Sequence, residues 1–164
     1  MTDHVVDTNV LLVASAAHPH SPFSDTHVPI DEQRVVFEWL VAFRADETRQ
    51  LALDDLFQIY DEYRKKLTDQ DFGLQVVSEK LANVRQVSID RDDDGHGVVP
   101  EAFRGFDRSD RQLLAVALTE PDTISIVNAC DSDWLGIERE LKAAGVRVEH
   151  IIEAWLRAHH AARR

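Results

Sequence analysis

The sequence lacks several features that would place it in particular protein classes. Its single cysteine, Cys130, cannot form an internal disulfide, which agrees with a reducing compartment. No apolar run approaches the roughly 18 residues that a membrane-spanning helix needs. The N-terminus has no basic segment ahead of an apolar stretch, so we expect no signal peptide. The expected protein is cytoplasmic and has no membrane partner.

Positive charge is also scarce. Eighteen Lys and Arg residues oppose 30 Asp and Glu residues, which gives a net charge of -12. This balance argues against general, salt-dependent binding of nucleic acid, because such binding needs a basic face. It allows a cluster of carboxylates that bound cations would partly neutralise. The 164 residues, 44% of them hydrophobic, fit a single domain over residues 1–164.

Short apolar runs alternate with amphipathic stretches along the chain. Strands are expected at residues 5–7, 51–53, 86–89, 123–127 and 146–148. Helices are expected at residues 10–17, 31–43, 55–67, 72–84, 109–118, 134–144 and 150–162. Two helix starts are assigned to capping boxes, Asp55 with Gln58 and Ser109 with Gln112. The predicted fold class is α/β: a three-layer α/β/α sandwich with a central, mainly parallel five-stranded sheet.

The functional hypothesis starts from Asp7, which ends the first predicted strand. Ligands of open parallel sheets bind at the carboxyl ends of strands, where the strand order switches. If the first and fourth strands are neighbours there, Asp7 and Asp131 face one crevice. Glu62 flanks the apolar stripe of its helix, Asp110 lies in a first helical turn, and Asp133 follows Asp131. Carboxylates suit Mg²⁺ or Mn²⁺ and metal-assisted phosphoryl transfer.

Each of these acids also has a purely structural interpretation. Asp7, Asp131 and Asp133 can cap the helices that follow them. Asp110 is a favourable charge at a helix start, and Glu62 is spaced for an exposed pair with its i+4 neighbour, a lysine. Only the joint placement of the acids favours a metal site over these alternatives.

Four segments, taken in order, resemble the motifs of the PIN-domain nuclease family, which includes the VapC-like toxin ribonucleases. The segments are residues 5–11 (VVDTNVL), 59–67 (IYDEYRKKL), 110–117 (DRQLLAVA) and 126–133 (IVNACDSD). Together they span nearly the whole chain. The fourth segment departs from the family pattern because Cys130 directly precedes Asp131. The division of labour between Asp131 and Asp133 is therefore left open.

The resemblance implies a PIN-like fold and a Mg²⁺- or Mn²⁺-dependent endoribonuclease that hydrolyses phosphodiester bonds of single-stranded RNA. It assigns catalysis to Asp7, Glu62, Asp110, Asp131 and Asp133, with the first four also binding metal. Thr8 and Asn9 would orient the first acid or the substrate phosphate, and Arg111 is a candidate RNA contact. Many family members are toxins with an inhibiting antitoxin protein, and many are dimers. Single-stranded or structured RNA, an antitoxin and a second copy are therefore the expected partners.

Other functions are also compatible with the residues. The charge of -12 favours a catalytically inactive PIN-like module that binds a protein partner or RNA. A phosphatase-like hydrolase with Asp7 as nucleophile would want a second aspartate where Asn9 stands. For RNA binding, the local basic patches are residues 64–66, Arg104 with Arg108 and Arg111, and residues 163–164.

Two further metal sites are conceivable. Residues 90–101 carry acids at positions 1, 3, 5 and 12 and glycine at position 6 of a calcium-loop pattern. Gly97 and Pro100 depart from that pattern, which favours an exposed acidic loop. His18, His20 and His27 could bind a transition metal, although no cysteine accompanies them in their proline-rich loop.

Overall fold

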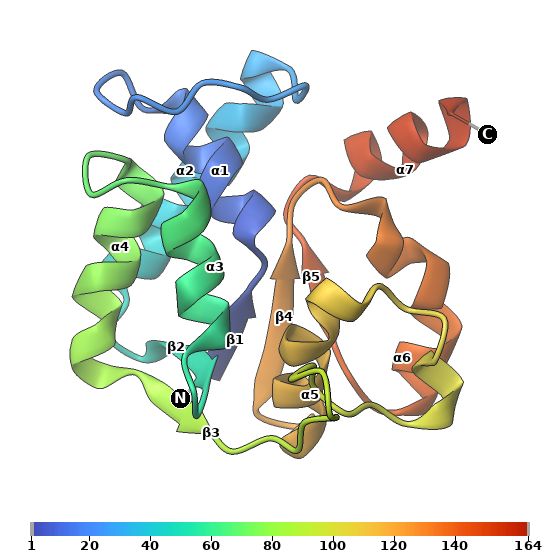
Figure 1. Cartoon of the computed structure of the whole chain (residues 1–164). Helices are drawn as coiled ribbons and strands as arrows, with labels where there is room; N and C mark the ends of the chain where they lie inside the picture. The colour runs from blue at the N-terminus through green and yellow to red at the C-terminus, as the bar shows by residue number, and fades with distance from the viewer. Residues whose placement is uncertain (1, 164) are drawn as a thin grey trace.

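The computed structural model describes residues 2–163, and its five strands form one sheet in which all neighbours are parallel (Figure 1). The strands are β1 (Thr2–Val6), β2 (Arg49–Asp54), β3 (Arg85–Val87), β4 (Ile124–Asn128) and β5 (Val148–His150). The α-helices are α1 (Thr8–Ala17), α2 (Ile30–Ala45), α3 (Gln58–Lys66), α4 (Phe72–Lys80), α5 (Arg111–Thr119), α6 (Glu138–Ala143) and α7 (Glu153–Ala162).

The helices cover both faces of the sheet. Helices α1, α2 and α4 pack against one another on one side, and α5 packs against β1, β2 and β4 on the other (Figure 1). Buried apolar side chains fill both layers, with Leu51, Leu53, Ile124 and Ile126 fully inaccessible to solvent. Strands enclosed in this way read as continuous apolar runs. The predicted three-layer α/β/α fold is confirmed.

The strand order, β3-β2-β1-β4-β5, places the switch point between β1 and β4. The chain proceeds from β1 outward to β3, then returns to build β4 and β5 on the other side of β1. Val6 is in register with Val127, and the Asp7 N–H donates to the Val127 carbonyl at 3.0 Å. The first and fourth strands are therefore neighbours, as the hypothesis about Asp7 required.

Both predicted capping boxes are wrong, because neighbouring aspartates take over the capping role. Helix α3 begins at Gln58, and the buried Asp54 carboxylate accepts the N–H groups of Gln58 and Ile59, each at 2.9 Å. Phe57 turns the chain in the left-handed region (φ 57°) between the strand and the helix. In the later helix, the Asp107 carboxylate accepts the Ser109 N–H at 3.0 Å.

Some predicted boundaries also shift. A 3₁₀ turn over Arg108–Asp110 precedes α5, and a 3₁₀ helix over Ser132–Ile137 precedes α6. Strand β5 begins two residues later than expected, because its pairing with β4 starts at Val148. None of the helices in residues 2–163 is long and apolar enough to cross a membrane.

Helices α1 and α4 approach closely at Gly73. A Cβ added to Gly73 would lie 2.7 Å from the Leu11 carbonyl oxygen and 2.9 Å from the Ser15 hydroxyl oxygen. We expect Gly73→Ala to lower the free energy of unfolding by about 1–3 kcal/mol, since a helix backbone cannot yield locally. Gly136→Ala is the matched control, because a Cβ there meets nothing within 4 Å. Urea unfolding measures both variants, and equal stability of the two would contradict this packing.

Candidate functional site

Three carboxylates meet at the switch point of the sheet. Oxygens of Asp7, Asp110 and Asp131 all lie within 4.8 Å of one another. Asp7 follows β1, Asp131 follows β4, and Asp110 ends the 3₁₀ turn before α5. The structure therefore brings together three of the four predicted metal ligands from segments that are far apart in the sequence. We call these three residues the acidic centre.

Asp7 is the most deeply buried member of the acidic centre. Its side chain is 5% exposed, and the Trp134 indole N–H donates to its Oδ2 at 2.7 Å. Burial raises the pKa of Asp7 to about 6, although the hydrogen bond from Trp134 acts in the opposite direction. At the preceding residue, the buried Tyr63 hydroxyl donates to the Val6 carbonyl, and this hydrogen bond connects α3 to the end of β1. Asp7 is thus held as a fixed, poorly solvated carboxylate.

The other two members titrate abnormally for similar reasons. Burial, followed by the charges of Asp7 and Asp131, raises the pKa of Asp110 to about 8. Burial also raises the pKa of Asp131 to about 6, although its carboxylate accepts the Asp133 N–H at 2.9 Å. Carboxylates in such proximity disfavour one another's ionised form. A bound cation would remove this repulsion.

The remaining two predicted acids lie around the acidic centre. Glu62, on α3, is half-buried, and its burial raises its pKa. Its charge contributes to the raised pKa values of Asp7 and Asp110, although Glu62 does not belong to the converging group of three. Asp133 is exposed and belongs to a second group with Asp107 and Asp110, again within 4.8 Å. This places Asp131 beside Asp7 and Asp133 on the outer side.

Asp107 belongs to the site region but was missed by the sequence analysis. The sequence does contain a signal for Asp107, because it stands three residues before Asp110. In a 3₁₀ turn this spacing places both carboxylates on one side. Its capping bonds to Ser109 made it look like an ordinary helix-start residue.

Asn9 connects Asp7 to the turn that carries Asp131, and its backbone and side-chain hydrogen bonds to Asp7 act to lower the pKa of that carboxyl. Its Oδ1 accepts the N–H groups of Ala129 and Cys130, each at 2.9 Å, and its Nδ2 donates to Asn128 Oδ1 at 3.0 Å. Asn128 in turn accepts the Asp131 N–H at 3.1 Å and donates to the Asp131 carbonyl at 2.9 Å. The role of Asn128 was not predicted from the sequence, although an amide at the end of a predicted strand is a signal for a hydrogen-bonded turn.

The other two predicted substrate contacts stay predictions. Thr8 is buried as the first residue of α1. Arg111 donates to the carbonyls of Arg104 (2.6 Å) and Phe106 (3.2 Å), which holds the loop before the acidic centre. Arg104 itself pairs with Glu101 at 2.7 Å. Of the predicted basic tail, residue 164 lies outside the described residues.

Two pockets are lined by residues next to members of the acidic centre, Ser109 before Asp110 and Cys130 before Asp131, although none of the three acids lines either pocket. One, of about 420 Å³, lies beside Glu62 between α3, α5 and the loop that carries His96. The other, of about 350 Å³, is lined by Asn9 and Cys130 together with residues 25–27. We call the first the α3–α5 pocket. An extended ligand bound over the acidic centre would reach the first pocket on the α3 side and the second pocket on the α1 side.

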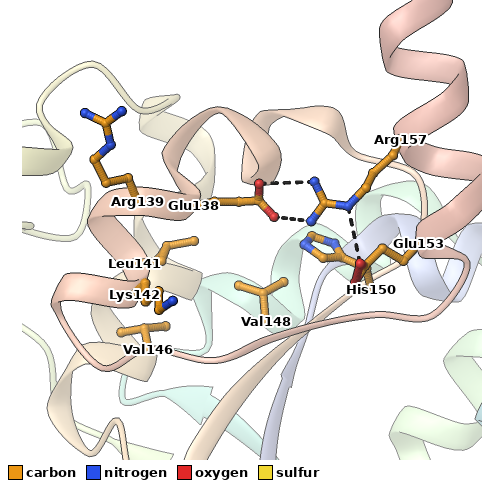
Figure 2. A pocket seen from close by; sticks show the side chains of 9 residues that line it. All are labelled: Glu138, Arg139, Leu141, Lys142, Val146, Val148, His150, Glu153 and Arg157. Carbon is orange, nitrogen blue, oxygen red and sulfur yellow. Dashed lines mark hydrogen bonds and ion pairs between the residues drawn. The ribbon is translucent and has the colours of Figure 1, made fainter.

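A further pocket of about 560 Å³ lies between β5, α6 and α7 (Figure 2). Arg157 bridges Glu138 and Glu153 across one side of it, and Val146 and Val148 form part of its lining (Figure 2). None of the predicted catalytic acids lines this pocket. The pocket is connected to the turn of Asp131 through His150, whose Nδ1 lies 3.1 Å from Asn128 Nδ2.

The two alternative metal sites do not assemble in the described part of the chain. Within residues 90–101, Arg91 and Gly97 form an antiparallel β-bridge through their backbones. The Asp92 carboxylate accepts the N–H groups of Asp94 and His96. These residues form a tight turn without flanking α-helices. His18 stacks on Phe72 and lies against the ring of His20, whereas His27 lies apart from them, against Trp155 and His159. Neither set is among the converging ligand groups found in residues 2–163.

Comparisons of the chain with protein-family models, with curated proteins and with solved structures found no match. The resemblance to the PIN-domain nucleases therefore stays a hypothesis.

The raised pKa of Asp110 predicts a pH-dependent penalty on stability. Folded Asp110 stays protonated up to about pH 8, whereas the unfolded chain ionises it from about its ordinary value of 3.8. Stability should therefore fall as pH rises through this interval. Asparagine carries no charge, so without metal Asp110→Asn should be more stable than the unaltered protein at pH 8, by about 1–3 kcal/mol.

Urea unfolding in EDTA at pH values from 4 to 8 measures this difference, which should vanish near pH 4. The control is Asp69→Asn, because the Asp69 side chain is exposed and belongs to neither group of converging acids. A pH-independent difference for Asp110→Asn would contradict the electrostatic account.

Proposed function

We propose that this protein is a Mg²⁺- or Mn²⁺-dependent endoribonuclease of the PIN-like type that cleaves single-stranded RNA. The observation that carries the proposal is the convergence of Asp7, Asp110 and Asp131 within 4.8 Å at the switch point of a parallel sheet. Ligands of such sheets bind there. The order of the four motif-like segments gives independent support from the sequence.

The acidic centre fits a hard divalent cation. All of its donors are carboxylate oxygens, which Mg²⁺ and Mn²⁺ prefer over softer ligands. Burial raises the pKa values of all three groups, and neighbouring carboxylates add to the effect, Glu62 on Asp7 and Asp7 on both Asp110 and Asp131; a cation would reverse that cost. Asp7, Asp110 and Asp131 would hold the ion, and Glu62 would complete the set from α3. When bound, the ion would stabilise charge on the phosphodiester and lower the pKa of a water ligand.

The surrounding residues keep the acidic centre in place. The Trp134 indole orients the Asp7 carboxylate, and the Asn9–Asn128 pair holds the backbone of Asp131. Such support by neighbouring hydrogen bonds is typical of ligands that must keep one orientation. Lys65 and Lys66 line the α3–α5 pocket and supply local positive charge for an RNA phosphate, despite the net charge of -12.

The proposal includes the biological setting that the resemblance implies. The enzyme would act as the toxin of a toxin–antitoxin pair, with an inhibiting protein and a second copy of this chain as further partners. The cytoplasm is the proposed location.

Metal-dependent cleavage tests the proposed activity. A fluorescently labelled single-stranded RNA should be cut in Mn²⁺ or Mg²⁺ and left intact in EDTA. Asp7→Asn should reduce the rate by about 100-fold or more, because the mutation removes a charge aimed at the reacting centre. Asp69→Asn, at an exposed position away from the site, is the matched control. Undiminished cleavage by Asp7→Asn would refute the site.

Metal binding separates the enzyme from the inactive module. Isothermal calorimetry at pH 7.5 should detect Mn²⁺ binding to the unaltered protein, and binding should raise its melting temperature. Asp110→Asn should lose most of this affinity, while Asp133→Asn should keep it if Asp131 is the ligand. The absence of Mn²⁺ binding would favour the alternative, a PIN-like module that binds a protein or RNA without cleaving it.

A further inference from the structure

The α3–α5 pocket is built mainly from hydrogen-bonding side chains. Its lining consists of Gln58, Asp61, Glu62, Lys65, Lys66, His96, Ser109 and Gln112. A volume of about 420 Å³ is within the range of small-molecule sites. Ser109 of this lining directly precedes Asp110 in the 3₁₀ turn, so the pocket opens beside the segment that carries one member of the acidic centre.

The wall that carries His96 is held rigidly against α3. Gln58 donates to the Gly95 carbonyl at 2.8 Å and accepts from the Arg91 side chain at 2.6 Å. The Asp92 carboxylate accepts the His96 N–H at 3.0 Å, and the His96 carbonyl accepts the Asp92 N–H at 2.9 Å. The backbone of the turn is therefore fixed, and a ligand in the pocket would require only side-chain reorientation of this wall.

Two polar atoms of this lining lack partners. Among the described residues, nothing hydrogen-bonds to His96 Nδ1 or to Gln112 Oε1, and both atoms are shielded from solvent. Buried polar groups are nearly always paired, because an unpaired one loses its hydration without compensation. The two side chains come from different segments and line the same pocket. A ligand that turns them toward itself would supply the missing partners.

We propose that the α3–α5 pocket receives one unstacked base of the RNA substrate and that Gln112 and His96 read its edge. This inference rests on the proposed function. Base edges present donors and acceptors in sequence-specific patterns, and a glutamine amide or an imidazole can pair with them. Lys65 and Lys66, in the same lining, are positioned to bind the adjoining phosphate. The pocket therefore sets a sequence preference at one nucleotide next to the cleaved bond.

Cleavage of an RNA oligonucleotide with a randomised sequence tests the base preference. Sequencing of the cut ends should show one favoured base at a single position beside the cleavage site. Gln112→Leu and His96→Ala should each weaken that preference by about tenfold, since each removes a discriminating hydrogen bond. Gln75→Leu, on the exposed surface of α4, should leave it unchanged. A uniform cut pattern, or an unchanged preference in both pocket variants, would overturn the inference while leaving the nuclease proposal intact.

Equilibrium binding provides a readout that does not need cleavage. Fluorescence anisotropy measures the binding of labelled oligonucleotides of A, C, G or U to the Asp110→Asn variant. One base should bind more tightly than the others, and adding Gln112→Leu should abolish that difference. Equal binding of all four oligonucleotides, or no binding, would overturn the proposed base site, whether or not the unaltered protein cleaves RNA. If Gln112→Leu does not unfold cooperatively, His96→Ala serves in both assays.

Discussion

The acidic centre imposes the main physical constraint on this structure. Asp7, Asp110 and Asp131 are held close together in a poorly solvated position, where burial disfavours ionisation of all three and the charges of Asp7 and Asp131 add to the effect on Asp110. Such an arrangement lowers stability at neutral pH unless a cation is bound. Folds retain unfavourable features of this kind when the rest of the structure holds them in place, and they are concentrated at functional sites.

The rest of the fold provides the restraint. The parallel pairing of β1 with β4 brings Asp7 and the turn of Asp131 to one edge. The paired amides of Asn9 and Asn128 then hold that turn, and the Trp134 indole fixes the Asp7 carboxylate. Each restraint is buried or half-buried, so each is electrostatically stronger than it would be in water. The same framework leaves pockets on either side of the centre.

Much of this arrangement could be predicted from the sequence. The buried run that ends at Asp7 and the β-branched run of β4 were recognisable as strands, because parallel strands covered on both faces are continuously apolar. The adjacency of these two strands was a condition of the hypothesis about Asp7, and the pairing of β1 with β4 meets that condition. The convergence of Asp110 could not be derived from spacing alone, because it depends on how α5 packs on the sheet.

Other features depended on tertiary structure and were missed or wrong. Asp54 caps α3 from inside β2, where its charge is balanced by Arg91 at 2.7 Å, a contact that spans 37 residues. Asn128 acts through hydrogen bonds to the turn that follows it. The sequence alone does not show where that turn begins and ends. The pocket side chains of His96 and Gln112 come together only because the turn before Gly97 packs against α5. Periodicity and local motifs contain no signal for such contacts.

Anomalous diffraction from crystals soaked in Mn²⁺ would test the central claim most directly. Our account predicts a manganese peak bounded by the carboxylates of Asp7, Asp110 and Asp131. A peak only at residues 90–101 or beside His27, or no peak at all at neutral pH, would contradict it.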